Sequence, residues 1–155
     1  MDIQKELREH LRELLEGKSA HIELEKAITE FPPDKINVKI ENAPHTAWQL
    51  LEHIRIAQWD IVEFSRNEKH VSPKFPDGLW VKTEGTASDW KKSCAEILKD
   101  LQAMRDLVAD EKTDLFAVIP HGDGKTILRE ALLVADYNAY HLGQIVFIMK
   151  TLERK

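Results

Sequence analysis

Two histidines of this sequence, His53 and His141, fall on apolar stripes of helical spacing, where an imidazole could bind a metal inside the fold. His53 is separated by three, four and eleven residues from Leu50, Ala57 and Phe64. On a helix with 3.6 residues per turn, these positions lie nearly above or below one another. His53 is therefore predicted to point into the interior of the protein.

His141 shows the same pattern, with apolar residues one and two turns away at Val134, Ile145 and Ile148. Tyr137 lies one helical turn before His141, so both side chains are predicted to point the same way. Gln144 continues that face, and Asp60 lies two turns from His53 on its side. These residues form the candidate site.

Inward histidines on two different helices permit two interpretations. Neutral imidazole is a common metal ligand, and helical bundles often build metal sites from side chains on facing helices. A histidine in a core can also be a structural residue whose ring nitrogens are hydrogen-bonded. Spacing alone leaves both interpretations open.

Four helical stretches must position these residues. The pattern predicts them at about residues 2–27, 46–66, 88–108 and 126–152. Gly17 and Ser19 interrupt the first stretch, and Ser19 could cap a second segment of it. Thr46 or His45 begins the second stretch, and either Thr86 with Asp89 or Ser88 alone is expected to cap the third.

The polar stretch of residues 67–85 contains Pro73, Pro76, Gly78 and Gly85 and shows no periodicity. Its length suits a crossover between bundle helices that are not joined by a tight hairpin. With no convincing strand, the sequence predicts one all-α domain over residues 1–155. Its expected architecture is a four-helix bundle with a long crossover between the second and third helices.

Composition excludes several classes of function. The chain has 22 Lys and Arg against 27 Asp and Glu, a net charge of −5, which gives no electrostatic reason to expect nucleic-acid binding. No apolar run approaches the length of a bilayer span, and the charged N-terminus is unlike a secretory signal. One cysteine, Cys94, excludes an intrachain disulfide. We expect no membrane association and a cytoplasmic location.

Three segments carry a resemblance to a known family. They are residues 17–21, residues 44–60 with His53, and residues 135–144 with His141. Trp80, Trp90 and residues 120–124 match in context, so the similarity spans nearly the whole chain. In these features the sequence resembles the DinB-like family of DinB/YfiT-type helical bundles.

The resemblance implies a bundle that is often a homodimer and that holds a divalent metal, such as zinc, nickel or manganese. In the family the ligands are one histidine of the second helix and an H-x-x-x-H pair of the fourth. Carried over by position, these are His53 and His141, while Tyr137 replaces the first histidine of the pair. Relatives include metal-dependent isomerases and thiol-S-transferases, so the resemblance implies a small-molecule substrate such as a low-molecular-weight thiol.

The substitution at Tyr137 leaves the third ligand open. Tyr137 could bind as a phenolate, although an ordinary pKa near 10 makes that costly. His21 could reach in from the first helix, or a carboxylate such as Asp60 could serve. Asp136 projects about 100° around the helix from Tyr137 and suits an outer position.

Other side chains are assigned lesser roles. Trp48 could line the rim of a pocket, although packing is the default role of a tryptophan. The remaining histidines, His10, His45, His70 and His121, are expected on the surface or in loops and not as metal ligands. Among them His45 and His121 are slightly favoured as ligands, because they flank helix starts.

Two hypotheses follow. The first is a metal-dependent enzyme, a hydrolase or thiol transferase, with its ion in the bundle core. The second is a metal-free, degenerate bundle that binds a small molecule or acts in stress-linked association. The residue that separates them is Tyr137.

Overall fold

The computed structural model describes residues 2–18 and 20–153. Its helices are α1 (Ile3–Glu16), α2 (Leu24–Thr29), α3 (Ala47–Arg66), α4 (Ala87–Ala109) and α5 (Ile127–Glu153), with short 3₁₀ turns η1 (Pro33–Lys35) and η2 (Asp77–Leu79). The described residues contain no β-strand, only one isolated bridge between Val118 and Thr126. The all-α prediction is confirmed.

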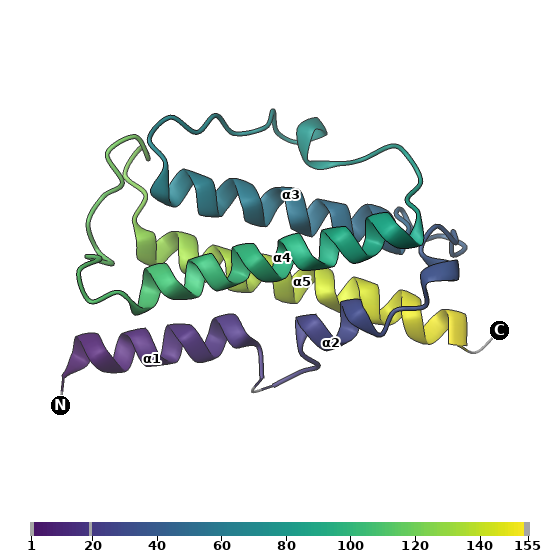
Figure 1. The fold of residues 1–155 in the computed structure, drawn as a ribbon, viewed down its shortest axis with the longest axis horizontal. Coiled ribbons are helices and arrows are strands. Elements are labelled where there is room, and N and C mark those ends of the chain that lie inside the picture. Colours follow the sequence, from purple (N-terminus) through teal and green to yellow (C-terminus); the bar gives the residue numbers. More distant parts are fainter. Residues whose placement is uncertain (1, 19, 154–155) are drawn as a thin grey trace.

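The three long helices α3, α4 and α5 pack side by side, and α1 and α2 lie end to end as the fourth member of the bundle (Figure 1). The first helical stretch is thus two helices. Gly17 ends α1 in the left-handed conformation at φ 66°. The predicted cap Ser19 lies outside the described residues, and α2 begins only at Leu24, without a side-chain cap.

The predicted N-terminal caps of α3 and α4 are confirmed. Thr46 and Gln49 form a reciprocal capping box at the start of α3, and Thr86 and Asp89 form another at the start of α4. At the other end of α4, the Arg8 guanidinium of α1 donates to the carbonyl oxygen of Val108 at 2.6 Å. These contacts satisfy backbone groups that a helix end leaves unpaired.

The crossover of residues 67–86 runs along the whole of α3. Figure 1 shows it as a loop above α3 that includes the short turn η2. It is needed because α3 and α4 start at the same end of the bundle and run in the same direction. Trp48 of α3 packs beneath it and donates its indole N–H to the Thr83 carbonyl at 3.1 Å. A Cβ atom on Gly85 would lie 2.4 Å from that indole, so only glycine fits there.

The core fills the space between α3, α4 and α5. Its largest fully buried apolar side chains in these helices are Leu51, Ile54, Val62, Ile97, Met104, Val108 and Ile145. Cys94 lies on the same α4 stripe, and burial raises the pKa of its thiol to about 11, which makes it unreactive near neutral pH. No helix in the described part of the chain is long and apolar enough to cross a membrane.

A candidate two-histidine metal centre

His53 is held in the interior by the crossover. It lies on α3 with 5% of its surface exposed, and its Nδ1 is 2.8 Å from the Leu79 carbonyl oxygen. A carbonyl only accepts, so the Nδ1 atom carries the proton and donates it. The neutral ring therefore presents its Nε2 lone pair on the opposite edge.

Trp80 fixes the plane of that ring. Its indole stacks on His53 with ring centroids 3.6 Å apart and planes 10° apart. On the other side, His45 is also stacked on Trp80, at 3.9 Å and 17°. The indole is therefore held between two imidazoles. His45, which was expected in a loop beside a helix start, thus borders the centre.

The second histidine comes from α5. His141 is 7% exposed, and its ring meets that of His53 edge-on, with centroids 4.7 Å apart and planes at 88°. The His141 Nδ1 atom donates to the side-chain oxygen of Gln144 at 2.8 Å. The proton of neutral His141 is therefore on Nδ1, and its Nε2 atom carries a lone pair. This Nε2 atom forms no hydrogen bond within residues 2–18 and 20–153.

Tyr137 lies beside both rings. Its ring centroid is 5.3 Å from that of His53 and 4.7 Å from that of His141. Its hydroxyl forms a short hydrogen bond with His53 Nε2. Because the His53 proton is on Nδ1, the phenol is the donor in this bond.

Burial sets the protonation of all three groups. Desolvation lowers the pKa of His53 below 6.5, with a further contribution from nearby His141, although the bond to Leu79 opposes it. Desolvation also lowers the pKa of His141, against the opposing bond to Gln144. The pKa of Tyr137 is raised to about 12 by burial. Near neutral pH the centre therefore holds two neutral imidazoles and a protonated phenol.

These lowered pKa values predict an acid-sensitive fold. Below pH 6.5 the unfolded histidines take up protons that folded His53 and His141 resist, so stability is full above that pH and falls as the pH decreases. Each histidine contributes a slope of at most about 1.4 kcal/mol per pH unit. Denaturant unfolding between about pH 7.5 and 5.5 should show a smaller decrease in His141→Gln than in the wild type. An equal decrease in both proteins would contradict the lowered pKa assigned to His141. The control is His10→Gln, on the exposed face of α1.

The donor set fits two ligands of a divalent metal. Metal-binding imidazoles are neutral and donate their other N–H group to an oxygen acceptor, as both His53 and His141 do here. Within the described ranges, no group of three or more His, Cys, Asp and Glu side chains could hold an ion. The candidate centre thus brings two neutral imidazoles together, with Tyr137 beside them.

The structure does not bring the other proposed ligands to this centre. His21 is exposed and its Nδ1 atom donates to the Ile22 carbonyl at 2.9 Å. Asp60 pairs with the largely buried His70 at 2.7 Å, and Asp136 is exposed on α5. Trp48, which was expected at the rim of a pocket, lies in the first turn of α3 and contacts the crossover.

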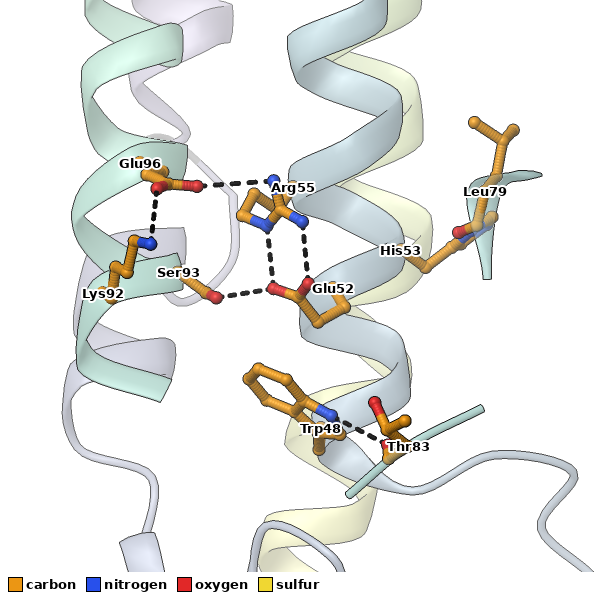
Figure 2. Close-up of polar contacts among 9 residues, drawn as sticks. All are labelled: Trp48, Glu52, His53, Arg55, Leu79, Thr83, Lys92, Ser93 and Glu96. Carbon is orange, nitrogen blue, oxygen red and sulfur yellow. Dashed lines mark hydrogen bonds and ion pairs between the residues drawn. The ribbon is translucent and has the colours of Figure 1, made fainter. Parts of the chain in front are cut away.

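A second polar cluster lies on a different side of α3. Figure 2 shows His53 directed toward Leu79, while Glu52 and Arg55 are directed toward α4. Glu52 is 6% exposed and accepts two bonds of 2.8 Å from Arg55 and one of 2.5 Å from Ser93. We call Glu52, Arg55 and Ser93 the α3–α4 clamp, because it fixes the side of α3 that faces α4.

Sequence reasoning missed Leu79 and Trp80 as parts of the site, and it favoured His45 only slightly among the loop histidines. Leu79 acts through its backbone carbonyl, which carries no side-chain signal. Trp80 stands in a polar stretch without periodicity, and a tryptophan there is the one signal that could have indicated a buried contact.

The structure thus combines a helical bundle, a long crossover and inward histidines on α3 and α5. The family model of the DinB superfamily matches residues 4–145, and the chain belongs to this superfamily. Searches of curated proteins and of solved structures found no match.

Proposed function

We propose that this protein is a metal-dependent enzyme of the DinB superfamily, with His53 and His141 as ligands of one divalent ion. The observation that carries the proposal is the matched hydrogen bonding of the two imidazoles. Each donates its Nδ1 proton to an oxygen, and the two neutral rings meet edge-on at 4.7 Å. An outer shell of this kind orients imidazole Nε2 atoms for metal binding.

The chain's own residues would divide the work. His53 and His141 would hold the ion, with Leu79 and Gln144 fixing their tautomers. A bound zinc, nickel or manganese ion lowers the pKa of a water or thiol and so supplies a nucleophile. Tyr137, whose pKa is raised to about 12, would remain a phenol and hold a proton on its hydroxyl. The reaction class is hydrolysis or thiol transfer on a small molecule.

One observation favours a second candidate. The Tyr137 hydroxyl donates to His53 Nε2, the atom that a metal would need. If that bond persists in solution, the site is a metal-free pocket and the protein binds a small molecule without metal chemistry. Binding an ion requires the phenol to release this nitrogen, so a metal titration separates the two candidates.

Calorimetric titration of untagged protein with zinc, nickel and manganese tests the proposal. We expect the wild type to bind one ion per chain, and His53→Ala to lose this binding. His10→Ala removes an imidazole from the exposed face of α1 and should bind like the wild type. Absence of binding in the wild type, or equal binding in His53→Ala, would overturn the proposal.

A further inference from the structure

A cavity of about 510 Å³ adjoins the two-histidine centre. It lies between the loop before α3 and the C-terminal half of α5. We call it the α5 cavity; it is lined by Ile40, Glu41, Asn42, Ala43, Pro44, His45, Leu50, Tyr140, Gly143, Gln144, Phe147 and Ile148. Its volume falls within the range of sites that bind small molecules.

Three of these lining residues also contact the centre. Gln144 accepts the Nδ1 proton of His141, and Tyr140 packs its ring edge-on against His141 with centroids 4.9 Å apart. His45 reaches His53 through the stacked Trp80. A molecule in the α5 cavity would therefore contact residues that hold His141 and Trp80 in place, on the Nδ1 side of His141, but not the His53 and His141 rings themselves.

The cavity offers an apolar surface and a few polar groups beside the centre. Leu50 and Ile148, both 3% exposed, contribute to an apolar lining, while Tyr140 and Phe147 at 67% and 66% exposed present two aromatic rings to solvent. The Gln144 oxygen is occupied by His141, but its side-chain amide N–H groups donate to nothing within the described residues. The ring nitrogens of His45 also form no hydrogen bond to any described residue, and desolvation, Lys39 and His141 lower its pKa, so the ring is neutral.

The charges of the lining decide which polar end fits. No lysine or arginine lines the cavity, and Glu41 is a carboxylate of the lining. A carboxylate or phosphate ligand would therefore meet the like charge of Glu41, while the ammonium of Lys39, which is not part of the lining, donates to the Pro44 carbonyl at 2.7 Å. The Gln144 amide donors and the neutral His45 instead suit an uncharged hydrogen-bond acceptor.

We propose that the α5 cavity binds an uncharged apolar molecule, with an aromatic or aliphatic body, whose carbonyl oxygen accepts hydrogen bonds from Gln144 and His45. This goes beyond the proposed function, because the molecule would contact Gln144 and His45 and not the Nε2 atoms of His53 and His141. The body would pack on the apolar wall between Leu50 and Ile148, and the carbonyl end would face Gln144 and His45.

Gly143 provides a substitution that tests the cavity. Gly143 lines the cavity, and a Cβ atom there would have no neighbouring atom within 4 Å, so the position has open space for the start of a side chain. Glycine is also the poorest non-proline residue for a helix interior, so Gly143→Leu should melt no lower than the wild type. Ala95→Leu, at an exposed position of α4, is the matched control.

The experiment uses the uncharged fluorophore N-phenyl-1-naphthylamine and metal-stripped protein. We expect saturable binding to the wild type and to Ala95→Leu, and a weakening of about tenfold or more in Gly143→Leu, because leucine fills the space the probe occupies. The ketone 4-phenylbutan-2-one should displace the probe, and the carboxylate 3-phenylpropionate should not. Equal probe binding in Gly143→Leu, or displacement by the carboxylate alone, would overturn the proposal.

His45→Phe tests the polar end. Phenylalanine can keep the stack on Trp80 but has no ring nitrogen, so it should remove the preference for 4-phenylbutan-2-one over butylbenzene, which lacks the carbonyl. An unchanged preference would contradict the assigned carbonyl contact. If sedimentation shows that Gly143→Leu dissociates a dimer while the probe fails to bind the wild type, a second copy of the chain occupies the cavity and the proposal is wrong.

The outcomes are separable from those of the proposed function because the probe is measured without metal. Probe binding that Gly143→Leu removes, in a protein that binds no ion, would support the cavity and contradict the metal-dependent enzyme. A stoichiometric ion in a protein whose cavity binds no probe would support the metal-dependent enzyme and contradict the cavity proposal.

Discussion

Replacing Tyr137 with histidine should increase affinity for a divalent metal by about tenfold or more, since even outer partners of a ligand change metal affinity by tenfold to a hundredfold. The Tyr137 ring already lies 4.7 Å and 5.3 Å from the two imidazoles. A histidine there would be the third imidazole on the same face, and three neutral imidazoles form a common divalent-metal site. Calorimetric titration of the untagged variant with zinc and nickel measures the change.

Tyr137→Phe is the matched control for that prediction. It removes the hydroxyl that bonds to His53 Nε2 but adds no ligand. We expect Tyr137→Phe to bind metal somewhat better than the wild type and clearly less tightly than Tyr137→His. If Tyr137→His binds no better than Tyr137→Phe, position 137 does not face the ion and the assignment of the centre on α5 is wrong.

Removing Glu52 should cost about 2–3 kcal/mol in the free energy of unfolding, somewhat less than the loss of one partner from a fully buried ion pair. Glu52 is buried, whereas the Arg55 side chain is 25% exposed and keeps a contact of 3.3 Å with Glu96. In Glu52→Ala, Ser93 also loses its acceptor. Urea unfolding at neutral pH measures the difference.

Glu63→Ala provides a control on the same helix. Glu63 and Arg66 form the same acid–base pair three residues apart, but the Arg66 side chain is 46% exposed. Its loss should cost about 0.5 kcal/mol or less, as for other exposed pairs. Equal losses in Glu52→Ala and Glu63→Ala would show that the α3–α4 clamp does not stabilise the fold.

The clamp also bears on the metal centre. Glu52 and His53 are neighbours on α3, so their side chains project about 100° apart. When Glu52 is fixed against α4, His53 is directed toward Leu79 (Figure 2). Its ring also bonds to the Tyr137 hydroxyl. We therefore expect Glu52→Ala to weaken metal binding as well as stability, although it touches no ligand.

Local chemistry made much of the fold predictable. The apolar spacing around His53 and His141 indicated inward-facing rings, and the structure buries both. Thr46 and Thr86 were recognisable as caps because capping is a local interaction within one helical turn. The interruption of the first stretch at Gly17 was predicted, and α1 ends there, but α2 begins only at Leu24, beyond the segment start expected after Ser19.

The rest of the site depends on contacts that are distant in the sequence. Leu79 and Trp80 reach His53 only because the crossover folds back along α3, and no periodicity describes such a segment. Asp60 shares the side of His53 on α3, yet the nearer partner His70 takes it. Spacing along one helix predicts which way a side chain points, but not which residue it meets.

The metal content of untagged protein purified from cells tests the central claim most directly. Elemental analysis should find close to one divalent ion per wild-type chain, and that ion should be absent from His53→Ala and His141→Ala. Wild-type protein that carries no ion, and whose melting temperature is unchanged by added zinc, nickel or manganese, would contradict the account.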